Sequence, residues 1–191
     1  MLKELILKNR SYRRYDSSVS ISNELLIEWV DNAMKTPSAR NSQPLRFIIV
    51  NEKHNNEFVF KNLKWAGYLK DWGGPNESEK PSSYILILVD KKITENADID
   101  IGIVAQTICL QTVEEGYGAC MFKSFNKKEI TEYYKINDEF SLSLVVAIGK
   151  PNEKIVIDEI NLNESIKYYR DNNDVHHVPK IRINDLILNI Y

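Results

Sequence analysis

The stretch that most constrains the fold is a long apolar helix predicted over residues 98–115. Helical spacing places Ile101, Val104, Ala105 and Ile108 on one face, and further apolar residues occupy the other faces. Because a helix that is apolar nearly all round must be covered on most sides, we expect it to be central or to lie in a subunit interface. Glycine tolerates the positive φ of a helix stop, so the run from Gly116 to Gly118 is predicted to end it.

The rest of the chain alternates irregularly between predicted helices and strands. Helical periodicity predicts helices at residues 1–8, 23–36 (capped by Ser22 and stopped before Pro37), 54–63, 126–134 (capped by Asn126) and 185–191. Apolar runs predict strands at residues 46–51, 84–89, 119–122 and 142–148. This irregular order favours an α+β sandwich over a strict βαβ array. A length of 191 residues without a linker or repeat predicts one domain, residues 1–191.

Composition excludes several classes of function. The formal net charge of −2 gives no overall attraction to nucleic acid or to an anionic membrane. No apolar stretch approaches the length of a transmembrane helix, and the apolar run at the amino terminus is too short for a signal peptide. Cys109 and Cys120 lie in apolar surroundings without CxxC spacing, which indicates reduced core cysteines in a cytoplasmic protein. The three histidines do not have metal-site spacing.

A polar loop between two prolines, residues 37–44, is the first candidate site. It follows a predicted helix and precedes a predicted strand, and loops in that position often present polar groups to ligands. Asn41 and Gln43 each offer a donor and an acceptor, which suits a heterocycle. The alternative is a helix-stop loop whose polar residues only cap and turn the chain.

A cluster of three arginines near the amino terminus is the second candidate. Arg10, Arg13 and Arg14 with Ser11 can supply forked donors and a hydroxyl to one phosphate. The alternative is a solvated charged face at a helix end. No GxGxxG or P-loop motif is present.

An aromatic, loop-like segment covers residues 64–83. Its side chains Trp65, Tyr68 and Trp72 form a lid or wall over a flat ligand, or else pack inward. The sequence leaves both alternatives open.

Taken in order, five short motifs resemble the flavin-dependent nitroreductase family, in a compact bacterial branch. They are Arg10-Ser11-x-Arg13-x-Tyr15, Pro37-Ser38-Ala39-x-Asn41-x-Gln43-Pro44, Gly116-x-Gly118-x-Cys120, Ala147-Ile148-Gly149-x-Pro151 and Val178-Pro179-Lys180. The resemblance implies a nitroreductase-like fold, in which helices flank a central, mixed, mainly antiparallel sheet in a three-layer sandwich. It also implies an intertwined homodimer with FMN at the interface.

The resemblance further implies roles for individual residues. Arg10, Ser11 and Arg13 would meet the FMN phosphate, with Lys180 or Arg182 adding positive charge. Pro37, Ser38 and Ala39 would line the ring edge, from the same or the partner subunit, and Asn41 and Gln43 would hydrogen-bond the ribityl chain or ring. Backbone amides near Met121, Lys123 and Ser124 would approach flavin N5. Two departures from the family pattern are Lys123, where glycine is expected, and Pro-Lys-Ile-Arg in place of Pro-Lys-Arg.

In such an enzyme the flavin carries the hydride chemistry, so no side chain is predicted to be catalytic. NADH or NADPH would be the donor, and a small electron-poor molecule such as a nitroaromatic or quinone the acceptor. The alternatives are a reductive dehalogenase or flavin-degrading enzyme on the same fold, or a non-enzymatic flavin-binding protein.

Overall fold

The architecture is built on an antiparallel sheet of five strands. A computed structural model describes all residues, 1–191. The strand order is β1-β5-β3-β2, and β4 also pairs with β5. These strands are β1 (Tyr15–Asp16), β2 (Leu45–Val50), β3 (Ser83–Asp90), β4 (Gly118–Phe122) and β5 (Phe140–Pro151). All eight residues of β3 are buried, as expected for a strand covered on both faces.

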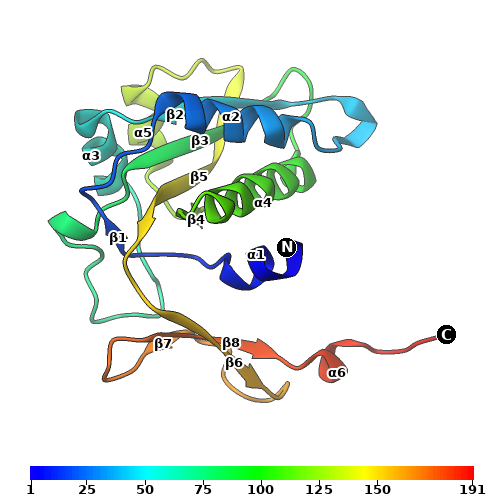
Figure 1. The fold of residues 1–191 in the computed structure, drawn as a ribbon. Helices are drawn as coiled ribbons and strands as arrows, with labels where there is room; N and C mark the ends of the chain where they lie inside the picture. Colours follow the sequence, from blue (N-terminus) through cyan, green and yellow to red (C-terminus); the bar gives the residue numbers. More distant parts are fainter.

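Helices cover the two faces of this sheet, which confirms the predicted α+β, three-layer arrangement (Figure 1). Alternate residues of β3 contribute to two separate cores. Ile85 and Ile87 pack with α2 and α4, whereas Leu86 and Leu88 pack with α3 and α5. The helices are α2 (Asn23–Met34), α3 (Lys53–Lys61), α4 (Asp98–Glu114) and α5 (Lys127–Tyr133).

The predicted central helix is α4. It buries Ile101, Val104, Ala105 and Ile108 against α2 and the sheet, and Gly116 ends it with φ +76°. Ile99, in its first turn, is 74% exposed, whereas Ile103, Leu110 and Val113 on its other faces are half-buried. The helix therefore occupies a buried core position and leaves one large apolar side chain, Ile99, exposed at its start.

The predicted cap of α2 is also present. Ser22 Oγ accepts a hydrogen bond from the backbone N–H of Leu25 at 3.2 Å, which satisfies one of the free donors of the first turn. Asn126 occupies the predicted N-cap position of α5, but its side chain makes no capping hydrogen bond. That part of the prediction was wrong.

The amino-terminal segment crosses the sheet at a close approach. After α1 (Leu2–Lys8), Ser11 pairs with Ala119 in an isolated parallel bridge, and the N–H of Tyr12 donates to the Ala119 carbonyl at 3.2 Å. A Cβ on Gly118 would lie 2.8 Å from Tyr12 Cε2 and 2.7 Å from Pro151 Cγ. Glycine at this position therefore lets the segment carrying Arg10 to Arg13 lie directly on β4.

The carboxyl-terminal part of the chain forms a second, small sheet that the sequence analysis missed. We call residues 155–181 the C-terminal sheet. Its strands are β6 (Ile155–Ile160), β7 (Tyr169–Arg170) and β8 (His176–Ile181), with β6 parallel and β7 antiparallel to β8. Figure 1 shows this sheet apart from the main body, on the side where α1 lies.

The final helix was predicted wrongly. The helix there, α6, is a single turn at Ile183–Leu186, and residues 187–191 are non-helical and exposed. The apolar spacing that suggested a longer helix instead leaves uncovered side chains at Leu186, Ile187, Leu188, Ile190 and Tyr191. None of the helices is long and apolar enough to cross a membrane.

Candidate functional site

A pocket of about 460 Å³ lies where the amino-terminal segment, α4, β4 and the C-terminal sheet meet. Its volume falls within the usual range for small-molecule sites. Five of the residues predicted for the site line it: Arg10, Ser11, Arg13, Met121 and Lys180. The other lining residues are Ile6, Asn9, Gln106, Cys109, Ala119, Tyr168 and Val178. The structure thus brings together predicted residues that are up to 170 positions apart in the chain.

The pocket carries positive charge without a matching carboxylate. No Asp or Glu lines it, and Arg10, Arg13 and Lys180 take part in none of the ion pairs of the chain. Arg10 donates from Nη2 to the Ile6 carbonyl at 2.6 Å, but its buried Nε–H has no partner. Burial lowers the pKa of Arg10. A buried donor without an acceptor and three unpaired cations are the features expected of an anion site.

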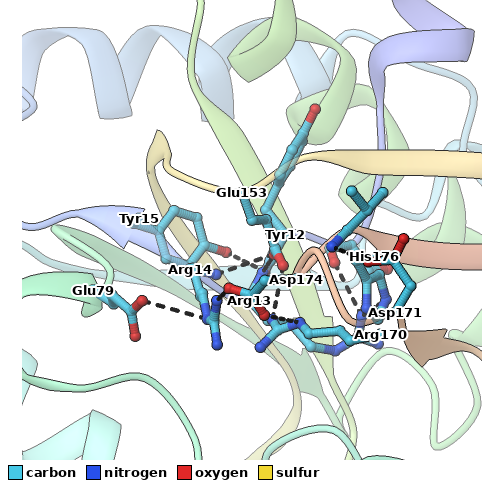
Figure 2. Close-up of polar contacts among 12 residues, drawn as sticks. Tyr12, Arg13, Arg14, Tyr15, Glu79, Glu153, Arg170, Asp171, Asp174 and His176 are labelled. Carbon is cyan, nitrogen blue, oxygen red and sulfur yellow. Dashed lines mark hydrogen bonds and ion pairs between the residues drawn. The ribbon is translucent and has the colours of Figure 1, made fainter.

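Arg13 is held by contacts from two directions (Figure 2). Its Nη1 donates to the Ser11 carbonyl at 3.2 Å and lies 3.1 Å from Nε2 of His176. The guanidinium carbon also lies 4.3 Å from the ring centroid of Tyr168, a cation–π contact. Nε and Nη2 make no hydrogen bond within the chain, so that edge of the fork remains available.

Arg14, the third arginine of the cluster, has a structural role instead. It forms ion pairs with Glu79, at 3.4 Å, and with Asp174. Its guanidinium also lies 5.7 Å from the ring of Trp72. The cluster therefore divides into two arginines that face the pocket and one that is neutralised on the other side.

Glu153 fixes the C-terminal sheet to the arginine segment, and the sequence analysis did not find it. Its side chain is 1% exposed and accepts from the backbone N–H groups of Arg13 and Arg14, the latter at 3.1 Å. It also pairs with Arg170 Nη2 at 2.8 Å (Figure 2). The only sequence signal was a carboxylate two residues after the Gly149-x-Pro151 motif, which has no diagnostic value by itself.

Three other predicted residues lie outside this pocket. Lys123 is exposed and pairs with Asp98 at 3.2 Å. Ser124 accepts from the backbone N–H of Lys64 through its own carbonyl, and Arg182 donates to Asn161 Oδ1 at 3.2 Å. Of the two cations considered for the carboxyl-terminal motif, Lys180 is therefore the one that lines the pocket.

The polar loop is also separate from the pocket of its own chain. Pro37, Ser38, Ala39, Asn41 and Gln43 lie in the connection from α2 to β2, which contains the 3₁₀ turn η1 (Ala39–Asn41). In Figure 1 this connection lies on the opposite side of α4 from the C-terminal sheet.

The loop nevertheless has a defined, strained conformation. Ser38 Oγ accepts from the backbone N–H of Gln43 at 3.0 Å, and Gln43 Nε2 donates to Asn41 Oδ1 at 3.2 Å. Arg40, Asn41 and Gln43 have φ values of 55°, 54° and 48°, a left-handed conformation that favours glycine.

The aromatic segment 64–83 does not behave as one unit. Trp65 packs inward, with its ring centroid 4.7 Å from Phe122. Tyr68 is half exposed and contacts Tyr168, ring centroid to ring centroid, at 4.9 Å. Trp72 lies under the Arg170 guanidinium at 4.5 Å. Inward packing is thus correct for Trp65. Tyr68 does not line the pocket itself but contacts Tyr168, which does.

Both cysteines are buried free thiols. Burial raises the pKa of Cys109 to about 12 and that of Cys120 to about 11, so neither is a thiolate near neutral pH. Cys109 contributes to the pocket wall as an apolar group. No group of three or more His, Cys, Asp or Glu side chains is placed to hold a metal ion.

Comparison with known proteins identifies the family of this chain. A family model described as the nitroreductase family matches residues 6–150. This chain belongs to the nitroreductase family. The match includes the arginine segment, the polar loop and β4, and ends before the C-terminal sheet.

Individual nitroreductase-family relatives are distant. A Bacillus subtilis (strain 168) protein named "Putative NAD(P)H nitroreductase YdgI" is 24% identical over 181 residues, covering 77% of this chain and 87% of the relative. An iodotyrosine deiodinase of Thermotoga neapolitana is 21% identical over 170 residues, covering 80% and 90%. The solved structure of an FMN-dependent nitroreductase from Clostridium difficile R20291 superposes with a TM-score of 0.64 at 24% identity, covering 78% and 87%.

Proposed function

We propose that this chain is an FMN-dependent NAD(P)H oxidoreductase that reduces small electron-poor acceptors such as nitroaromatics or quinones. The observation that carries the proposal is the acid-free pocket, in which Arg10, Arg13 and Lys180 converge without carboxylate partners. Membership of the nitroreductase family and the FMN- and NAD(P)H-related names of relatives support the choice of cofactor and donor.

The residues of the pocket fit the phosphate end of FMN. A phosphate monoester carries close to two negative charges near neutral pH and has three acceptor oxygens. The partnerless Nε–H of Arg10, the free edge of Arg13 and the ammonium of Lys180 offer donors to it. FAD would add a second phosphate and an adenosine, for which the chain has no dinucleotide motif, so we expect FAD to bind more weakly.

The ring end of FMN requires a second copy of the chain in this proposal. Met121 of β4 lines the pocket, and we assign the backbone of Lys123 and Ser124, which directly follow this strand, to the flavin N5 side. Pro37, Ser38, Ala39, Asn41 and Gln43 do not line the pocket of their own chain, and we assign them to the site of the partner subunit.

The apolar surface supports the same homodimer. Exposed apolar side chains occur on α1, at the start of α4 and along the carboxyl-terminal segment, at Leu2, Ile6, Leu7, Ile99, Leu188 and Ile190. Exposed apolar groups in such numbers mark an interaction surface, and a stable dimer interface resembles a protein core cut in half. A second copy would cover them while supplying the missing loop.

FMN held in this pocket would supply the hydride chemistry between NADH or NADPH and the acceptor. The chain's own residues would bind and orient the cofactor. Arg10, Arg13 and Lys180 neutralise the phosphate, and Cys109 and Ala119 supply an apolar wall. We assign no general acid or base. The buried free cysteines are consistent with a cytoplasmic enzyme, and we propose that residues 1–191 form one domain.

The direct test is to add FMN to purified protein and measure saturable binding, with about one FMN per subunit expected. Reduction of the bound flavin under anaerobic conditions by NADH and by NADPH, followed by a screen of acceptors, would identify the donor and the acceptor class. Arg13→Ala should weaken FMN binding by roughly 1.5–3 kcal/mol, whereas the exposed Arg40→Ala should have little effect. Absence of saturable FMN binding would refute the proposal.

Reductive dehalogenation is the second candidate, because one relative is named an iodotyrosine deiodinase. In this structure Trp65 is packed inward and Trp72 lies against Arg170, so neither ring covers the pocket of its own chain. Release of iodide from iodotyrosine by the reduced enzyme, at a rate above that of nitroaromatic reduction, would favour this candidate.

A further inference from the structure

The contacts of Arg13 show that the C-terminal sheet, not only the arginine segment, organises the positive end of the pocket. His176 is fully buried at the start of β8, and its Nε2 lies 3.1 Å from Arg13 Nη1. Because a guanidinium can only donate, Nε2 of His176 must accept, and the ring proton must lie on Nδ1. That Nδ1 is buried without a hydrogen-bond partner. The single hydrogen bond of this imidazole is therefore directed to Arg13.

Tyr168 holds the opposite side of the same guanidinium. Its ring lies 4.3 Å from the Arg13 guanidinium carbon and 5.4 Å, centroid to centroid, from the His176 ring. Its hydroxyl accepts from the backbone N–H of Tyr68 at 3.4 Å, which ties the ring to the segment after α3. The two aromatic side chains thus limit both the plane and the rotation of the guanidinium, and leave Nε and Nη2 free.

His176 must be neutral to accept this hydrogen bond. Burial, together with the positive charges of Arg13, Arg170, His177 and Arg14, lowers the pKa of His176 to about 4. The contact therefore persists throughout the neutral range. The adjacent His177 faces away, toward Asp158 at 3.0 Å and Asp171 at 3.5 Å.

We propose that His176, together with Tyr168, is a positioning residue that fixes Arg13 for the phosphate and so makes the C-terminal sheet the element that selects phosphorylated flavin. This inference rests on the proposed FMN function. An arginine without these contacts keeps its charge but loses a defined geometry, and it would then pay rotamer entropy on binding. The selectivity for FMN over riboflavin, which lacks the phosphate, is consequently the quantity that His176 controls.

The test compares FMN and riboflavin binding to full-length protein by quenching of flavin fluorescence. The variants are His176→Leu, which removes the acceptor, and His176→Gln, whose amide oxygen can reach the position of Nε2. His177→Leu is the matched control on the same strand, and far-UV circular dichroism checks the fold of each variant. We expect His176→Leu to weaken the affinity for FMN about tenfold or more and to change the affinity for riboflavin less than about twofold.

Rescue and coupling provide two further readouts. His176→Gln should restore FMN affinity to within about threefold of wild type, since a charged donor again has an acceptor. In the Arg13→Ala background, His176→Leu should cause no additional loss, because the two residues act as one unit. His177→Leu should change the affinities for FMN and riboflavin by the same factor or leave both unchanged.

Each alternative result has a defined meaning. Suppose that wild-type protein binds FMN, and that His176→Leu weakens the affinities for FMN and riboflavin by the same factor or changes neither. That result would overturn this inference and leave the proposed function intact. Additive losses in the Arg13 and His176 variants would also overturn it. Wild-type protein that fails to bind FMN would overturn the proposed function and this inference together. If His176→Leu does not fold, His176→Asn, whose amide is too short to reach Arg13, should reproduce the selective loss.

Discussion

Removal of the Glu153 carboxylate should detach the C-terminal sheet from the main body. The side chain is 1% exposed and has three partners: the backbone N–H groups of Arg13 and Arg14 and the guanidinium of Arg170. The Arg170 side chain is itself only 10% exposed, and its remaining carboxylate contact, with Asp174, is at 4.0 Å. Glu153→Ala would leave a nearly buried cation and two backbone donors without their acceptor.

The magnitude follows from these contacts. Removal of one partner from a buried ion pair typically costs about 3–5 kcal/mol, because the other charge remains desolvated. Glu153→Gln keeps one oxygen for the two backbone N–H groups and loses the charge. A hydrogen bond to a charged group contributes about 1.5–3 kcal/mol, so we expect a loss in this smaller range for Glu153→Gln. Glu159→Ala, an exposed residue of β6 without an ion pair, is the matched control and should change stability by less than about 0.5 kcal/mol.

The assay is urea unfolding followed by tryptophan fluorescence, combined with amide hydrogen exchange of residues 155–181. Trp72 lies against Arg170 and should report the release of that guanidinium. We expect exchange in β6 and β8 to accelerate in Glu153→Ala, while β3 remains protected. A loss below about 1 kcal/mol, or equal protection of β6 and β8 in wild type and variant, would show that Glu153 does not anchor the sheet.

Three further predictions concern packing, pH and assembly. Gly118→Ala should destabilise the fold by roughly 1–3 kcal/mol in urea unfolding, because the added Cβ would overlap Tyr12, and a neutral result would contradict the close approach described. The pKa of His176 is lowered to about 4 in the folded chain from an ordinary value of 6.5, so the unfolded state binds more protons between these values. The free energy of unfolding should therefore fall by about 3 kcal/mol as pH drops from 6.5 to 4, and His176→Gln should remove this contribution to its pH dependence. His177, whose pKa is raised by two aspartates, contributes in the opposite direction. Ile99→Asp should convert the proposed dimer to a folded monomer in light scattering, and an unchanged dimer would place the interface elsewhere.

Long, regular elements of the fold were predictable from sequence. Residues 98–114 and 84–89 have runs of apolar residues long enough to fix both the type of element and its burial. The C-terminal sheet was not predictable by the same means. β7 has two residues, and in β6 and β8 polar and apolar side chains do not alternate between a buried and a solvent face. The parallel pairing of β6 with β8 also depends on contacts between distant residues.

Part of the candidate site was likewise predictable from the sequence, and part was not. The spacing of Arg10, Ser11 and Arg13 was enough to suggest a phosphate site, whereas Lys180, about 170 residues away, joined them only through resemblance to a family. Tyr168, His176 and Glu153 were visible only as parts of aromatic, histidine or acidic clusters. Their roles depend on which partner each meets across the fold, and a single sequence does not carry that information.

The first and the last segments that line the pocket lie near opposite ends of the chain, and this has a consequence for biosynthesis. Arg13 and Tyr168 are separated by 155 residues, and ribosomes add roughly 5–20 residues per second. The arginine segment therefore leaves the ribosome roughly 10–30 s before the C-terminal sheet can pack beside it. If the pocket holds FMN as proposed, a nascent chain cannot complete the phosphate site during that interval, and we expect cofactor binding to be a late event in maturation.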